Sequence, residues 1–112
     1  MKVLIVGAGR VGSRVIKQLM KNPTITIITV DPRETPNAVE EGLIESVDYF
    51  LELNPNDIIS VIKHVEPDLV LVTTSSEDIT RSDVPGLEIL VESLRSELEA
   101  TAEVPIIAVA RN

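Results

Sequence analysis

Five short runs of mostly apolar residues, separated by longer amphipathic stretches, are the feature that most constrains the fold of this chain. Isoleucine and valine together make up a quarter of the 112 residues, a composition that favours strands buried on both faces. The runs are Lys2–Val6, Ile25–Val30, Val47–Leu51, Asp68–Thr73 and Pro105–Ala110. Buried strands that alternate with helices predict a Rossmann-like, doubly wound α/β fold with about five parallel strands in the order 3-2-1-4-5.

The stretches between these runs carry helix signals. Four helices are expected: Arg10–Lys21, a short one from Pro36 to Glu41, Asn56–Val65, and one that carries the apolar stripe Leu87–Leu98. Thr35 is predicted to cap the short helix, and Asn54-Pro55 to open the next one. Residues 74–86 are predicted to form a polar loop. The chain is expected to be one domain over residues 1–112, and a sixth strand is expected to be missing.

The composition excludes several classes of site. Cysteine is absent and His64 is the single histidine, so disulfides, zinc–cysteine sites, iron–sulfur clusters and multi-histidine metal sites are not available. His64 is expected to lie on the surface or near a helix C-terminus, without chemistry. A net charge of −8 argues against nucleic-acid binding. No apolar run approaches the length of a membrane span and no secretory signal is visible, which favours a soluble cytoplasmic protein.

A glycine-rich segment, Gly7-Ala8-Gly9-Arg10-Val11-Gly12, follows the first strand and opens the first helix. This is the context that a dinucleotide-binding GxGxxG requires. Gly7 permits the tight turn, Gly9 allows a pyrophosphate to approach the backbone, and Gly12 allows close packing of the helix on the strand. The helix N-terminus offers amide groups to the phosphates, and the Arg10 guanidinium can reach the same anion. The alternative is a loop kept for packing alone.

Asp31 ends the second predicted strand, 19 residues after Gly12, where an acid can accept hydrogen bonds from the adenine ribose. Its charge favours NAD(H) over NADP(H), and its loss is expected to weaken binding and leave the fold intact. A turn-forming Asp-Pro is the alternative. Arg33 can accommodate a 2′-phosphate, pack over the adenine or lie exposed. Thr73, Thr74 and Ser75 lie at the carboxyl end of the fourth strand, where they face the central ligand position or cap the loop.

These segments together resemble the TrkA-N domain, also called KTN, the nucleotide-binding half of the RCK regulators of potassium conductance. The resemblance rests on KVLIVGAGRVGSRVIKQL at residues 2–19, Val30-Asp31, DLVLVTTSSED at 68–78 and PIIAVARN at 105–112. It implies a Rossmann-like domain that binds NAD(H) or adenine nucleotides, dimerises and gates potassium channels or transporters without catalysis. Matched by position, Gly7, Gly9, Arg10 and Val11 would line the pyrophosphate.

Two features depart from the family pattern. The family commonly has Gly-Asp after the third strand, near the adenine, where this chain has Leu51-Glu52. Glu52 keeps the acid, but the lost glycine leaves the adenine contacts open. Asp78–Gly86 is interpreted as an insertion before the last helix.

Three functions remain open from the sequence. The first is a regulatory module that binds NAD(H), with ATP, ADP or NADP as further candidates, in a homo-oligomer that partners a membrane potassium channel or transporter. The second is the cofactor-binding half of an NAD-dependent oxidoreductase, because fold and cofactor motif do not fix an activity. The third is a dimerisation module that has lost its ligand. The first is the one we expect.

Overall fold

A computed structural model describes residues 1–52, 54–73 and 104–109 of the chain. Five parallel strands form one sheet in the order β3-β2-β1-β4-β5, which confirms the predicted fold class and strand order. The strands are β1 Lys2–Val6, β2 Thr26–Asp31, β3 Tyr49–Phe50, β4 Leu69–Val72 and β5 Ile106–Ala108. The helices are α1 Arg10–Leu19, α2 Asn37–Glu40 and α3 Pro55–Val65. The predicted loop at 74–86 and the Leu87–Leu98 helix lie outside the described residues.

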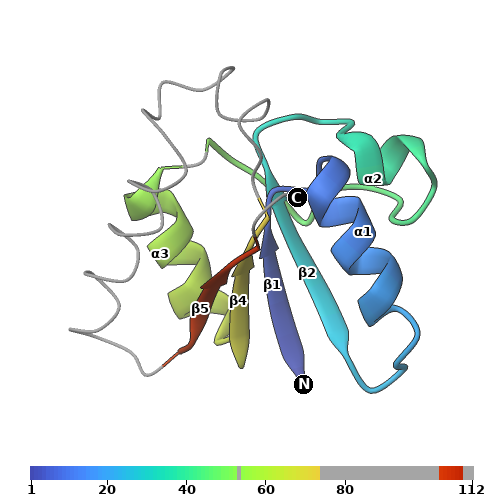
Figure 1. Ribbon diagram of the computed structural model, residues 1–112. Helices are drawn as coiled ribbons and strands as arrows, with labels where there is room; N and C mark the ends of the chain where they lie inside the picture. Colours follow the sequence, from blue (N-terminus) through green and yellow to red (C-terminus); the bar gives the residue numbers. More distant parts are fainter. Residues whose placement is uncertain (53, 74–103, 110–112) are drawn as a thin grey trace.

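The sheet is covered on both faces, with α1 and α2 on one side and α3 on the other (Figure 1). Strand β1 lies in the middle and alternates its side chains between the two sides. Leu4 and Val6 join the apolar cluster under α3, while Val3 and Ile5 join the cluster under α1 and α2. All four side chains are buried. This double burial explains why β1 is apolar without alternation.

Strand β3 is shorter than the predicted Val47–Leu51, because a side chain takes the place of a backbone pair at its start. One carboxylate oxygen of Asp48 accepts from the backbone N–H of Thr29, at 2.8 Å, and from the Thr29 hydroxyl, at 3.2 Å. Strand pairing therefore begins only at the next position, where Tyr49 lies opposite Val30. Strand β5 likewise begins at Ile106 and not at the proline before it.

The start of α2 also differs from the prediction. Pro36 occupies the N-cap position and no side chain of the described residues caps this helix, so the prediction of Thr35 as the cap was wrong. The helix is held instead by its backbone, because the N–H of Ala38 donates to the carbonyl oxygen of Ala8 at 3.0 Å. The first turn of α2 is thereby attached to the glycine-rich segment.

The predicted opening of α3 is confirmed. Asn54 caps the helix by accepting from the N–H of Asp57 at 2.9 Å, and Pro55 is the first helical residue. The exposed side chain of His64 contacts the ring of Tyr49 edge-on, with centroids 6.5 Å apart. None of the helices in the described part of the chain is long and apolar enough to cross a membrane.

Candidate functional site

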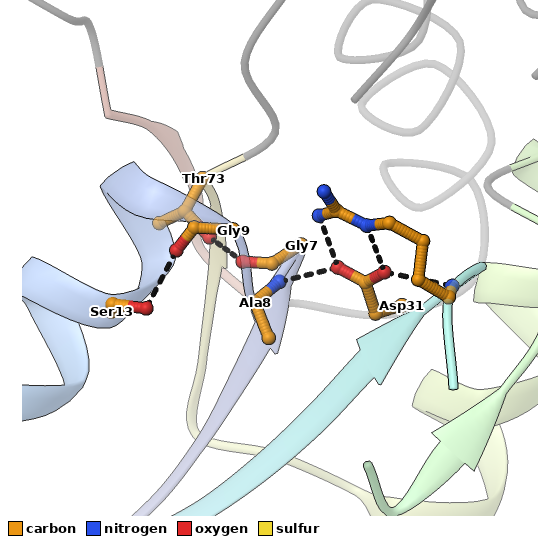
Figure 2. A network of polar contacts seen from close by, with 7 residues as sticks. Gly7, Ala8, Gly9, Ser13, Asp31 and Thr73 are labelled. Carbon is orange, nitrogen blue, oxygen red and sulfur yellow. Dashed lines mark hydrogen bonds and ion pairs between the residues drawn. The ribbon is translucent and has the colours of Figure 1, made fainter. Parts of the chain in front are cut away.

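The carboxyl ends of β1, β2 and β4 meet at one edge of the sheet. Val6 of β1 lies opposite Val30 of β2 and Val72 of β4, so the residues after these three positions lie at one level. They are Gly7, Asp31 and Thr73, which Figure 2 shows around the start of α1. The predicted grouping of the glycine-rich segment with Asp31 and Thr73 is therefore present.

Gly7 makes the turn from strand to helix in a backbone conformation that favours glycine. Its φ is 104°, a left-handed value that a side chain disfavours. Its N–H donates to the carbonyl oxygen of Val30 at 2.8 Å. Gly12 serves a different need, because a Cβ on this residue would lie 2.0 Å from the carbonyl oxygen of Gly7. The roles predicted for these two glycines agree with this geometry.

Ala8 ties the turn to two neighbouring elements. Its N–H donates to the Oδ2 atom of Asp31 at 2.7 Å, which attaches the turn to the end of β2. Its carbonyl oxygen accepts from Ala38 at the start of α2. The methyl group is completely buried. Both backbone groups of Ala8 therefore bond within the protein, and its N–H is not the donor expected for a phosphate.

The N-terminus of α1 is arranged differently. Gly9 is the N-cap residue, no side chain of the described residues caps the helix, and its first turn carries no acid. The carbonyl oxygen of Gly9 accepts from the N–H and the hydroxyl of Ser13, both at 2.8 Å. The amide groups at the start of a helix have no intrahelical acceptor. Those of Arg10 and Val11 are therefore suited to an anion, and the Arg10 side chain is exposed beside them.

Asp31 is completely buried and accepts four hydrogen bonds. Besides Ala8, the donors all belong to Arg33: its backbone N–H and Nε reach Oδ1, each at 2.9 Å, and an Nη atom reaches Oδ2 at 3.0 Å. Figure 2 shows these contacts around the carboxylate. A carboxylate has about four lone-pair positions. The oxygens predicted to receive a ribose are thus occupied by the protein's own donors.

Two sequence interpretations change as a result. The side chain of Arg33 is 25% exposed and paired in a bidentate ion pair, so the interpretation of a simply exposed arginine was wrong. Asp31 also supports the turn through Ala8. The expectation that the fold does not depend on Asp31 is therefore replaced by a role in holding the glycine-rich segment.

Thr73 lies beside the glycine-rich segment. It is completely buried, and its hydroxyl donates to the carbonyl oxygen of Gly7 at 2.6 Å. Its N–H donates to the carbonyl oxygen of Val6 at 3.0 Å. The hydroxyl therefore holds the turn in place. Thr74 and Ser75 lie outside the described residues, and Glu52 is exposed two residues after the end of β3.

The family is decided by a sequence comparison. The family model described as the TrkA-N domain matches residues 3–112. This chain belongs to the TrkA-N family. The match extends over nearly the whole sequence and confirms the resemblance found from the glycine-rich segment and the fourth and fifth strands. No curated protein matches the chain.

Three solved structures are similar in fold to this TrkA-N domain. A dTDP-glucose 4,6-dehydratase from Bacillus anthracis in complex with NAD superposes with a TM-score of 0.69 at 18% identity, covering 98% of this chain and 37% of that one. A UDP-glucose 4-epimerase from Thermotoga maritima with UDP-glucose gives 0.66 at 18%, covering 96% and 37%. A UDP-glucuronic acid 4-epimerase from Bacillus cereus in complex with NAD gives 0.64 at 17%, covering 100% and 40%.

These likenesses show the Rossmann-type fold of the TrkA-N domain. The chain spans less than half the length of the enzymes that it resembles. The geometry described above fits a dinucleotide at its phosphate end, where no described side chain caps α1 and its first turn carries no acid. It fits less directly at the ribose end, where Asp31 is already engaged.

One polar network near the site was not predicted from the sequence. Asn37 donates to the hydroxyl of Ser13 at 2.9 Å and to the carboxylate of Glu41 at 2.8 Å. Glu41 also pairs with Lys17 at 3.3 Å. Together with the Ser13 bond to Gly9, the network links the first turn of α1 to α2. No spacing rule connects residues 24 positions apart, so the sequence offered no signal for it. The described residues contain no group of acids or histidines suited to a metal ion.

Proposed function

We propose that this TrkA-N domain is a regulatory module that binds NAD(H) or a related adenine nucleotide such as ATP or ADP. We propose further that it acts in a potassium channel or transporter system, at the cytoplasmic side of a membrane partner, and that it performs no catalysis itself. The family match supports the assignment, because the resemblance associates this domain with ligand sensing and potassium transport.

The observation that carries the proposal is the N-terminus of α1. The chain leaves β1 through a glycine with φ of 104° and enters a helix that no described side chain caps. The turn is held by hydrogen bonds from Thr73 to Gly7 and from Ala8 to Asp31. A helix N-terminus next to a glycine-rich turn binds a pyrophosphate through amide N–H groups and the helix dipole.

The hydrogen bonds around this turn support the proposed regulatory role. Ala8 is bonded to α2, and Gly9 is bonded to Ser13, which in turn contacts Asn37 of α2. A ligand held at the turn would therefore act on α1 and α2 together. A ligand shifts an equilibrium between arrangements only by its different affinity for each of them. We propose that a homo-oligomer supplies those alternative arrangements.

The second candidate is the NAD-binding part of an oxidoreductase. It is favoured by one observation, that two of the similar folds are enzymes solved in complex with NAD. The two candidates predict different behaviour with a reduced cofactor. An oxidoreductase that contains this domain would oxidise NADH when its oxidised substrate is supplied, whereas a sensor would bind NADH and return it unchanged.

Thermal melting tests the proposal with NAD, NADH, NADP, ATP and ADP, each against buffer alone. A ligand at about 100 times its dissociation constant adds about 2.7 kcal/mol of apparent stability, which raises the melting temperature by several degrees. We expect a selective rise with NAD(H) or an adenine nucleotide. Light scattering with and without that ligand then reports the oligomeric state. No rise with any nucleotide would contradict the proposed function.

The matched variant for this experiment is Gly9→Val. The φ of Gly9 is −77°, which a side chain can adopt, so the substitution does not force a left-handed backbone. Its side chain would stand where the pyrophosphate approaches. We expect the variant to lose the nucleotide-induced rise. Binding that survives unchanged in Gly9→Val would show that the ligand lies elsewhere.

A further inference from the structure

The ribose end of the proposed site is filled by the protein itself. Two of the four hydrogen bonds to the Asp31 carboxylate come from backbone groups, those of Ala8 and Arg33. The other two come from the guanidinium of Arg33. A ribose diol also offers two donors, one on each hydroxyl. The diol and the guanidinium therefore compete for the same two acceptor positions on one buried carboxylate.

We propose that Arg33 is an internal competitor for the ribose of the nucleotide, and that binding of the diol requires the guanidinium to leave Asp31. This inference rests on the proposed function, since it concerns the same site. The exchange leaves every acceptor on Asp31 satisfied, because two hydroxyl donors replace Nε and Nη while Ala8 and the Arg33 backbone N–H stay in place. The side chain of Arg33 is 25% exposed, so one side of it already faces solvent.

The replacement of the guanidinium by the ribose hydroxyls determines how tightly the site binds a nucleotide. Only molecules in which Arg33 has left Asp31 accept the diol, and the apparent dissociation constant rises by the inverse of their fraction. Charge-assisted, bidentate pairs are among the stronger hydrogen bonds in proteins. The ion pair of Arg33 therefore lowers the affinity for nucleotides with a free ribose and leaves the contacts to the phosphates unchanged.

The test compares ADP with 2′,3′-dideoxy-ADP, which carries the same phosphates and base but lacks the diol. Dissociation constants are measured by calorimetry for the wild type, for Arg33→Ala and for the control Arg14→Ala. Arg14 is an exposed residue of α1 outside the ion pair, so the control removes the same charge without freeing Asp31. The ratio of the two affinities cancels the general loss of positive charge, because that loss weakens both ligands alike.

We expect the preference for ADP over the dideoxy analogue to rise about tenfold in Arg33→Ala, the change when nine tenths of the wild-type molecules hold the closed pair. The preference should stay unchanged in Arg14→Ala. A preference that is unchanged or reduced in Arg33→Ala would overturn the inference. Loss of Arg33 leaves a buried carboxylate without its ion partner, so each variant is titrated well below its own melting temperature.

A second measurement uses the wild type alone and does not depend on a variant. The Nε–H of Arg33 is hydrogen-bonded to Asp31, so its NMR signal should be protected from exchange with water in the free protein. We expect ADP to abolish this protection and the dideoxy analogue to leave it intact. Protection that persists with ADP bound would overturn the inference while the proposed function stands. If ADP, NAD(H) and ATP bind neither to the wild type nor to Arg33→Ala, the proposed function fails and the inference falls with it.

Discussion

The two ends of the proposed nucleotide site differ in how much of their binding capacity the protein has already used. At the phosphate end, the first turn of α1 carries no capping side chain from the described residues and no acid. At the ribose end, four donors of the protein occupy Asp31. Under our proposal, a ligand at the first end displaces no described side chain, whereas a ligand at the second end displaces the Arg33 guanidinium. An acid at the expected spacing is therefore not by itself an available acid.

The largest effect is expected at the phosphate end, from Gly12→Ala. The added Cβ would lie 2.0 Å from the backbone oxygen of Gly7 and 3.2 Å from the hydroxyl of Thr73. Backbone cannot move aside as a flexible side chain does, so we expect a loss of about 3 kcal/mol or more in the free energy of unfolding. Urea denaturation measures it.

Gly42→Ala is the matched control for that prediction. Gly42 has a φ of 74° but nothing lies within 4 Å of an added Cβ, so only backbone strain of about 1 kcal/mol is expected. Equal losses in the two variants would show that the contact between Gly12 and the turn is not the source of the effect.

Asp31→Ala should have the next largest effect and tests the ribose end. Removing the carboxylate takes away the acceptor of the Ala8 N–H and breaks the bidentate pair with the Arg33 guanidinium. Loss of one partner of a buried pair costs about 3–5 kcal/mol, and partial exposure of the arginine reduces this to about 2–3 kcal/mol. Asp31→Asn keeps one oxygen and should lose less. If Asp31→Ala unfolds at the wild-type urea concentration, Asp31 has no role in holding the turn.

Thr73→Val should give a smaller loss, because it removes one hydroxyl and preserves the shape. The hydroxyl bond to Gly7 is 2.6 Å long and completely buried, and a buried hydrogen bond of this kind contributes about 1 kcal/mol. We expect a small shift in the urea midpoint together with weaker nucleotide binding, since the turn loses its support. A variant as stable as the wild type would place the support of the turn elsewhere.

The smallest effect is expected from Lys17→Ala, which lies away from both ends. Its ion pair with Glu41 is 3.3 Å long, and the two side chains are 51% and 39% exposed. Exposed pairs contribute roughly 0–1 kcal/mol, so stability and nucleotide affinity should stay close to those of the wild type. A marked loss of affinity would mean that the Ser13–Asn37 network transmits more to the turn than its exposure indicates.

The sequence predicted correctly those features that depend on a local preference or on a periodic pattern of residues. The double burial of β1 is visible in Val3–Val6 as an unbroken apolar run, and the turn is visible in Gly7 and Gly12 because only glycine meets its needs. The cap of α3 by Asn54 follows from a local side-chain preference. These signals were sufficient for the strand order and for placing Gly7, Asp31 and Thr73 at one edge of the sheet.

The features that the sequence did not predict depend on side-chain and backbone contacts that the spacing of residues does not determine. Asp48 shortens β3 by bonding Thr29 across the strands, and α2 is held by Ala8 instead of a capping side chain. Arg33 was visible as a charge near Asp31, but nothing in the sequence showed that the two form a closed pair. Partner choice among nearby polar groups is decided by the assembled backbone, so it appeared only in the structure.

The most direct test of the central claim is the map of backbone amide shifts when NADH is titrated into the isotope-labelled protein. The account predicts that the largest shifts fall on Gly9, Arg10 and Val11 at the N-terminus of α1. Smaller shifts should fall on Asp31 and Arg33. Shifts that are centred on α3, or no shifts at saturating NADH, would contradict it.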